Sequence, residues 1–114
     1  MPTIYHNPRC SKSRNTLALL ESKGITPDIV LYLDTPPDKT ELKSIVAKLG
    51  LGVRDIIRTG EALYQHLSLK DDSLSDEQLL EAIAEHPKLL QRPIVVDGKH
   101  AIIGRPPEKV LDLI

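Results

Sequence analysis

Phenylalanine and tryptophan are absent from this chain, and cysteine occurs once, at Cys10. With 114 residues, the chain has the length of one domain, and its core must be built from Leu, Ile, Val and Ala. A single cysteine excludes an intramolecular disulfide, and a serine at position 13 excludes a C-x-x-C redox pair. Cys10 therefore reacts with the thiol of another molecule or has no redox role.

Neither charge sign is in large excess, because 15 Lys and Arg face 16 Asp and Glu and the sequence pI is about 6.4. A basic excess is the mark of nucleic-acid and membrane-surface proteins, so we expect no such partner. No apolar run approaches the roughly 18 residues of a membrane span. The N-terminus lacks a basic segment followed by an apolar one, so we expect a cytoplasmic protein. We also expect a monomer, because no predicted helix has a large apolar surface that would need a partner.

Metal binding is not expected either. A zinc site would need Cys10 together with histidines, and the four histidines at positions 6, 66, 86 and 100 have no ligand spacing relative to it.

The first third of the chain predicts a β-α-β unit. Thr3–Tyr5 has the pattern of a short strand, and Ser11 and Ser13 are typical of a helix start. Gly24 is a natural helix stop. Residues 28–33 are rich in β-branched and aliphatic side chains, which predicts a fully buried strand.

The middle of the chain predicts helices. Asp38 with Glu41, and Ser75 with Gln78, form capping pairs ahead of apolar residues at helical spacing. Helices are expected at 38–49, 53–58, 61–67 and from 75 to Pro87.

The last quarter predicts a hairpin and a helix. Two apolar runs, 94–96 and 101–103, flank Asp97-Gly98, the signal of a type I′ turn. A final helix is expected to begin at Pro106-Pro107, with Val110, Leu111 and Ile114 on one face.

This order, β-α-β and then β-β-α, is that of an α/β protein with the thioredoxin-like fold. We expect one domain over 1–114, with a helical insertion at about 38–90. In that fold a redox cysteine follows the first strand at the start of the first helix, which is the place of Cys10. A cis-proline stands beside the cysteine, and Pro93 has that place.

The surroundings of Cys10 favour a thiolate. A sulfur just ahead of a helix faces free N–H groups and the positive end of the helix dipole. His6 can hold a positive charge four residues upstream, and serine hydroxyls can donate to the sulfur. A structural cysteine would normally lie in an apolar run, whereas cations flank this one: Arg9, Lys12 and Arg14.

Arg58, Arg92 and Arg105 stand beside glycine or proline, which suggests fixed positions. Planar guanidinium groups suit tetrahedral oxyanions, although each arginine could equally be a solvated charge or part of a salt bridge. A protein-phosphatase loop, C-x5-R, is excluded because residue 16 is threonine and Arg14 is too early.

Four separated motifs resemble the glutathione/glutaredoxin-coupled arsenate reductase (ArsC) family, from about residue 3 to the C-terminus. They are His6-Asn7-Pro8-x-Cys10-x-x-Ser13-Arg14-Asn15-Thr16, Leu31-Tyr32-Leu33, Arg92-Pro93-Ile94-Val95-Val96 and Gly104-Arg105-Pro106. The segment 7–14 resembles the YfgD-like branch of that family.

The resemblance implies that the Cys10 thiolate attacks arsenate and forms a thiolate–arsenic adduct. It assigns Arg58, Arg92 and Arg105 to oxyanion binding, His6 to lowering the cysteine pKa, and Ser13 to a hydrogen bond with the sulfur. Glutathione, a co-substrate, would attack the adduct, and glutaredoxin would remove the glutathionyl group. Arsenite is the product, and no bound cofactor is implied.

The chain departs from the well-studied reductases beside the cysteine, where it has Arg9 for a small residue and Ser11-Lys12 for Gly-Thr. These extra cations either strengthen oxyanion binding or select a larger anion such as glutathione. Two alternatives remain: a glutathione-dependent thiol oxidoreductase of another substrate, and a regulator like the Spx proteins that bind RNA polymerase. Many of those regulators carry a C-x-x-C switch and lack the full arginine set.

Overall fold

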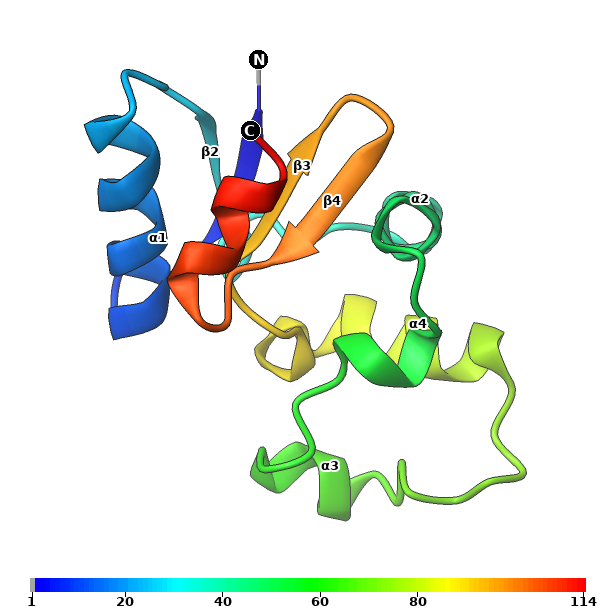
Figure 1. Cartoon of the computed structure of the whole chain (residues 1–114). Coiled ribbons are helices and arrows are strands. Elements are labelled where there is room, and N and C mark those ends of the chain that lie inside the picture. The colour runs from blue at the N-terminus through cyan, green and yellow to red at the C-terminus, as the bar shows by residue number, and fades with distance from the viewer. Residues whose placement is uncertain (1) are drawn as a thin grey trace. The chain divides into compact units, whose positions relative to one another are not determined.

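The computed structural model describes residues 2–114 and divides the chain into two compact units (Figure 1). One unit is formed by the chain up to Thr35 and again from Arg92 onward, and the other by residues 36–91. Cys10 belongs to the first unit.

The first unit contains a four-stranded mixed sheet. Its strands are β1 (Thr3–His6), β2 (Asp28–Leu31), β3 (Ile94–Asp97) and β4 (His100–Ile103), in the order β2-β1-β3-β4. β1 pairs parallel with β2 and antiparallel with β3, and β3 pairs antiparallel with β4. With helix α1 (Ser11–Ser22) between the first two strands, this is the predicted thioredoxin-like arrangement.

One face of the sheet is covered by α1 and by the 3-10 helix η3 (Pro107–Asp112), which lies in front of the strands in Figure 1. Ile4, Leu20, Val95 and Val110 form the buried core on this face. The predicted face of the last helix was wrong in part. Because 3-10 residues three apart align, Leu113 joins Val110 on the core, while Leu111 and Ile114 are exposed.

β2 is not the fully buried strand that its composition predicted. It lies at the edge of the sheet, where it pairs with β1, and Ile29 is 50% exposed and Leu31 39% exposed. The strand also ends at Leu31, two residues earlier than expected.

The turn of the β3–β4 hairpin also differs from its prediction. Asp97 pairs with His100, so the two loop residues are Gly98 and Lys99 rather than Asp97 and Gly98. Gly98 has a φ of +61°, whereas the φ of Lys99 is not positive. One positive φ at the first loop position fits a type II′ turn, whereas type I′ needs two.

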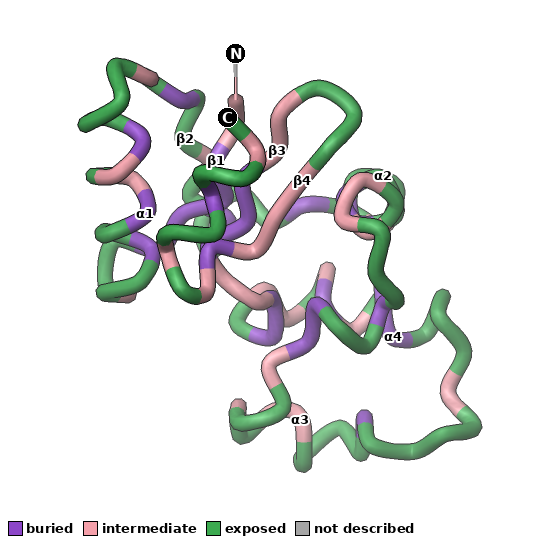
Figure 2. The backbone as a smooth tube through the Cα atoms, in the orientation of Figure 1, coloured by how far each residue is buried: buried purple, intermediate pink, exposed green. Residues whose placement is uncertain are grey.

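The second unit is helical, as expected. It contains α2 (Lys39–Leu49), η1 (Val53–Ile56), α3 (Ala62–His66), α4 (Asp76–Glu85) and η2 (Pro87–Leu89). Both predicted caps are confirmed: Asp38 accepts from the backbone of Glu41, and Ser75 and Gln78 form a reciprocal capping box. The buried stretches of α2 and α4 (purple in Figure 2) carry the unit's own core: Leu42, Ile45, Leu79, Leu80 and Ile83.

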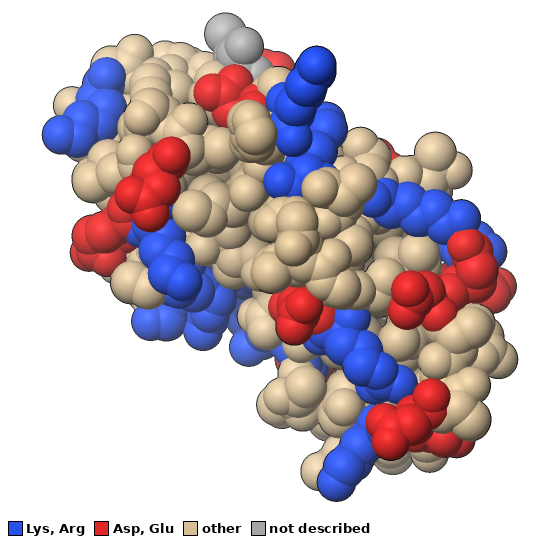
Figure 3. All heavy atoms as spheres, turned by 45° about the vertical axis from the view of Figure 1, so that its right-hand side comes forward, with Lys and Arg blue, Asp and Glu red and all other residues tan. Residues whose placement is uncertain are grey.

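Charges of both signs are interspersed over the face shown in Figure 3, in keeping with the balanced composition. Within residues 2–114, no helix is long and apolar enough to cross a membrane.

Candidate active site

The loop between β1 and α1 is held in one shape by its own hydrogen bonds. The backbone N–H of Cys10 donates to the carbonyl of Asn7 at 3.0 Å, and the N–H of Arg9 donates to the Asn7 side-chain oxygen at 3.0 Å. Arg14, one turn into α1, donates to the carbonyl of Pro8 at 2.8 Å. Cys10 is thereby fixed as the residue that precedes the first turn of α1.

The Cys10 thiol is free, partly exposed and acidified. Burial alone would raise its pKa. The backbone N–H of Ser13, the guanidinium of Arg92 and the backbone N–H of Lys12 outweigh that effect and bring the pKa below its ordinary value of 9.0. The structure therefore favours the thiolate, which is the nucleophilic form of the side chain.

His6 and Ser13 form a buried pair behind the cysteine. Ser13 Oγ lies 2.6 Å from His6 Nδ1 and accepts the backbone N–H of Asn7 at 3.0 Å. Burial, with help from the Arg14 charge, lowers the pKa of His6, so the imidazole is neutral at pH 7. The expectation of a positive His6 is not supported. Ser13 meets the sulfur through its backbone N–H, while its hydroxyl is engaged by His6 and Asn7.

Arg92 and Arg105 are brought together at the start of β3. Arg105 Nη1 donates to the carbonyl of Arg92 at 3.2 Å. The expected cis bond at Arg92-Pro93 is confirmed, and Arg105-Pro106 is also cis. Arg92 faces Cys10 directly, whereas Arg105 supports the backbone that carries Arg92.

Gly104 lies between Thr16 of α1 and Pro93, which follows Arg92. A Cβ on this residue would lie 2.7 Å from Thr16 Oγ1 and 2.9 Å from Pro93 Cγ. The Gly104 N–H also donates to the Pro93 carbonyl at 2.9 Å. Glycine is therefore needed here for space, which keeps the helix that carries Cys10 close to the strand that carries Arg92.

Arg58 belongs to the second unit. Its Nη1 donates to Glu61 Oε2 at 3.1 Å, and its backbone N–H donates to the Leu89 carbonyl at 2.7 Å. A salt bridge was one of the alternatives to oxyanion binding that the sequence left open for this arginine. The role of Arg58 in oxyanion binding stays a prediction.

Tyr32 is a residue whose place in the site the sequence did not reveal. It is 0% exposed, and the side chains of Asn7 and Arg92 face its hydroxyl. Burial raises the pKa of the phenol, the two neighbours oppose that effect, and a charged Cys10 adds to it. Tyr32 stands in one of the resemblance motifs, but without spacing or chemistry that marked it as a site residue.

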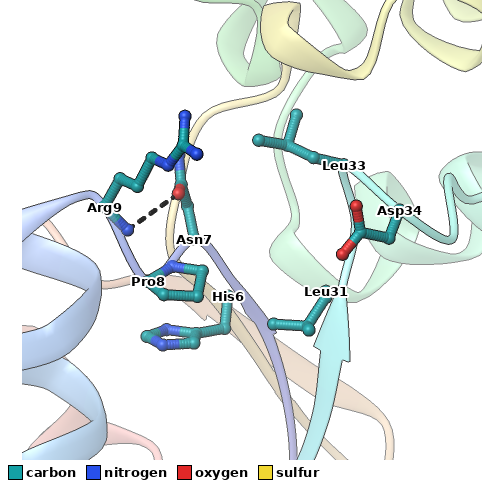
Figure 4. Close-up of a pocket in the computed structure, with 7 residues that line it drawn as sticks. All are labelled: His6, Asn7, Pro8, Arg9, Leu31, Leu33 and Asp34. Atoms are coloured by element: carbon teal, nitrogen blue, oxygen red, sulfur yellow. Dashed lines mark hydrogen bonds between the residues drawn. The ribbon is translucent and has the colours of Figure 1, made fainter.

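A pocket of about 300 Å³ opens beside the cysteine loop (Figure 4). The β1–α1 loop, with Arg9, forms one wall. Across the hollow, Asp34 directs its carboxylate inward, beside the apolar side chains of Leu31 and Leu33 (Figure 4). The complete lining is His6, Asn7, Pro8, Arg9, Leu31, Leu33 and Asp34. Within residues 2–114, no group of three or more His, Cys, Asp or Glu side chains is placed to hold a metal ion.

Comparison with known proteins gives consistent matches over nearly the whole chain. Residues 5–113 match the ArsC family. A Haemophilus influenzae protein named arsenate reductase is 54% identical over 112 residues, covering 97% of each chain. Escherichia coli K12 YfgD is 52% identical over 112 residues, which cover 97% of this chain and 94% of YfgD. A solved structure entitled arsenate reductase from Vibrio cholerae is 54% identical, with a TM-score of 0.98, and the match covers 99% of this chain and 97% of that one.

Proposed function

Since this chain belongs to the ArsC family, we propose that it is an arsenate reductase that works in the cytoplasm as a monomer, with Cys10 as its nucleophile. The observation that carries the proposal is the acidified Cys10 thiol, which faces both the first N–H groups of α1 and the Arg92 guanidinium. Such a place lets an anionic nucleophile and an anionic substrate meet, because fixed positive groups balance the charge of both.

In the first step the Cys10 thiolate attacks arsenic and forms an S–As bond. The hydroxyl of the protonated arsenate takes up a proton from solvent and leaves as water, and arsenic stays in the As(V) state. Arg92 and Arg105, with Arg58 as the family resemblance implies, bind the remaining oxygens. Guanidinium donors suit this task because their planar N–H groups match pairs of oxyanion oxygens.

In the second step the glutathione sulfur loses its proton and bonds to the Cys10 sulfur, while the S–As bond breaks and its electron pair stays with arsenic, so that the two sulfurs together supply two electrons. Arsenic is reduced from As(V) to As(III) and leaves as arsenite, and a disulfide joins Cys10 to glutathione. A glutaredoxin thiolate then attacks that disulfide, takes the glutathionyl group and returns Cys10 to the thiolate. With one cysteine in the chain, the second thiol has to come from another molecule.

His6 and Ser13 position the cysteine loop in this proposal. The Ser13 hydroxyl joins His6 on β1 to the backbone of Asn7, and the Ser13 N–H faces the sulfur. The neutral imidazole therefore acts through Ser13 and the loop geometry rather than through a positive charge.

The pocket beside Arg9 supports glutathione as the second substrate. Glutathione carries carboxylates and an ammonium group at neutral pH, and the pocket offers Arg9 on one wall and Asp34 on the other. Leu31 and Leu33 offer apolar surface for its carbon chain. The same pocket also favours the second candidate function, a glutathione-dependent thiol oxidoreductase with a substrate other than arsenate.

The test is NADPH oxidation in the presence of arsenate, glutathione, glutaredoxin and glutathione reductase. We expect arsenate-dependent turnover with the wild type and none with Cys10→Ser, which keeps the shape of the loop but removes the thiolate. Omitting glutaredoxin should also stop turnover. Cys10→Ser should melt close to the wild type, so that a loss of rate reports chemistry rather than unfolding.

Three results would contradict parts of the proposal. Turnover by Cys10→Ser would remove the thiolate mechanism, and full activity with thioredoxin in place of glutathione and glutaredoxin would remove the coupling. Absence of turnover in a folded wild type that still forms a mixed disulfide with glutathione would favour the second candidate.

A further inference from the structure

Asn7, Tyr32 and Arg92 meet near Cys10, just outside the ends of strands β1, β2 and β3. Tyr5 on β1 pairs with Val30 on β2 and with Ile94 on β3. Just beyond these paired residues, the side chains of Asn7 and Arg92 face the hydroxyl of Tyr32.

Two buried donors here make no hydrogen bond, although the side chains of Asn7 and Arg92 face the Tyr32 hydroxyl. Among the residues that the structure describes, Tyr32 Oη and Arg92 Nε are buried side-chain atoms without a hydrogen bond. A buried polar atom without a partner costs about 1–3 kcal/mol. If Tyr32 only filled the core, a phenylalanine would fill the same space without this loss of free energy.

The chemistry of the two atoms indicates what they bind. The Tyr32 phenol is a donor at neutral pH because burial raises its pKa, and Arg92 Nε–H can only donate. Two neighbouring donors without partners can share one acceptor. Because one of the donors belongs to an arginine, an oxygen that carries negative charge is the acceptor that suits them best. Arg92 also faces the Cys10 sulfur, so that oxygen belongs to a group held at the sulfur.

We propose that the Tyr32 hydroxyl is a further oxyanion donor of the site, which donates to an oxygen of the tetrahedral anion at Cys10 while Arg92 Nε–H donates beside it. The identification of that anion with arsenate rests on the proposed function. The binding of a tetrahedral oxyanion between Tyr32 and Arg92 does not.

The test variant is Tyr32→Phe, which removes only the hydroxyl. We expect it to melt at or above the wild-type temperature, because an unsatisfied buried atom has been removed. The matched control is Tyr64→Phe, the same change in the helical unit. Both are compared with the wild type in the alkylation of Cys10 by iodoacetamide, with increasing arsenate or inorganic phosphate and without any thiol reductant.

In the wild type and in Tyr64→Phe, the anion should protect Cys10 from alkylation. In Tyr32→Phe, the anion concentration that gives half protection should rise about 10- to 100-fold, the range for losing a hydrogen bond to a charged group. The pH profile of alkylation without anion is recorded for each variant, so that protection is compared at equal thiolate fractions. In the coupled assay, kcat/KM for arsenate should fall in Tyr32→Phe by a similar factor.

A second measurement uses the wild type alone and does not depend on the variant folding. The chain has three tyrosines, so labelling with ¹³C at the ring ζ carbon gives three NMR signals. Phosphate should shift the Tyr32 signal, with assignments from the Tyr5→Phe and Tyr64→Phe variants. A Tyr32 signal that stays fixed while the anion protects Cys10 would overturn the inference.

The remaining outcomes separate the two proposals. Equal protection of the wild type and Tyr32→Phe overturns the role of Tyr32, and so does a wild type that neither anion protects. Protection that weakens in Tyr32→Phe, together with no arsenate turnover in the wild type, supports the oxyanion role and contradicts the proposed function.

Discussion

Replacing Gly104 by alanine tests the close packing that brings Cys10 and Arg92 together. The added methyl would lie 2.7 Å from Thr16 Oγ1, 2.9 Å from Pro93 Cγ and 3.2 Å from Thr16 Cγ2. Real Cβ atoms essentially never approach other atoms closer than 3.0 Å, and Thr16 is fully buried. The Thr16 hydroxyl is held by a bond to the Lys12 carbonyl at 2.8 Å. Neither neighbour is the free end of a flexible side chain.

The cost of such overpacking is about 1–3 kcal/mol. Gly104 is not among the glycines with positive φ, so backbone strain adds nothing to this figure. For a chain of this size each kcal/mol lowers the thermal midpoint by about 4 °C, so we expect Gly104→Ala to melt about 4–12 °C below the wild type. The movement of α1 away from Arg92 should also raise the pKa of Cys10 toward its ordinary value.

The assay is thermal unfolding followed by circular dichroism, with Gly60→Ala as the control. Gly60 has no atom within 4 Å of a built Cβ and no positive φ, so alanine there should be neutral or stabilising by up to about 1 kcal/mol. Thr16→Ala removes two of the three close contacts. The double variant with Gly104→Ala should therefore be more stable than the sum of the two single changes predicts.

A Gly104→Ala variant that melts within about one degree of the wild type would refute the reasoning. It would show that α1 and the Arg92 segment can move apart without a loss of stability. Strict additivity in the double variant would refute the assignment of the clash to Thr16.

Two further predictions concern protonation. Alkylation of Cys10 should follow a titration centred below 9.0, and Arg92→Gln should move it upward because the guanidinium stabilises the thiolate; a wild-type midpoint at or above 9.0 would contradict the site. His6 has a folded pKa below its unfolded value of 6.5, so the unfolded chain binds more protons as the pH falls, and the thermal midpoint should drop between about pH 7 and 5. His6→Gln should reduce this drop; equal slopes in the wild type and in His6→Gln would show that His6 is not the cause.

Features set by neighbouring residues could be predicted from the sequence. The caps at Asp38 and Ser75 and the stop at Gly24, with its φ of +77°, depend on the chemistry of a few consecutive residues. The place of Cys10 at the start of α1 also follows from local pattern and element order. These features needed no knowledge of what packs against them.

Features set by distant residues could not be predicted. The exposure of β2 depends on the order of strands in the sheet, since a run such as Ile29-Val30-Leu31 is equally suited to a central strand. The neutral state of His6 follows from its burial and from Arg14. Tyr32 enters the site only because β2 lies beside β1, and no spacing in the sequence marks that neighbour relation.

The first unit is built from the two ends of the chain, with the whole helical unit between them. β1 is synthesised first, yet its antiparallel partner β3 and the Arg92 guanidinium come in the last quarter. Pairing across such a long loop is a late event in folding. Until the final strands have been made and have joined the sheet, the Cys10 thiol lacks the Arg92 guanidinium and has only the backbone N–H groups of Ser13 and Lys12 to lower its pKa. We therefore expect the thiol of the nascent chain to be less acidic than that of the folded protein.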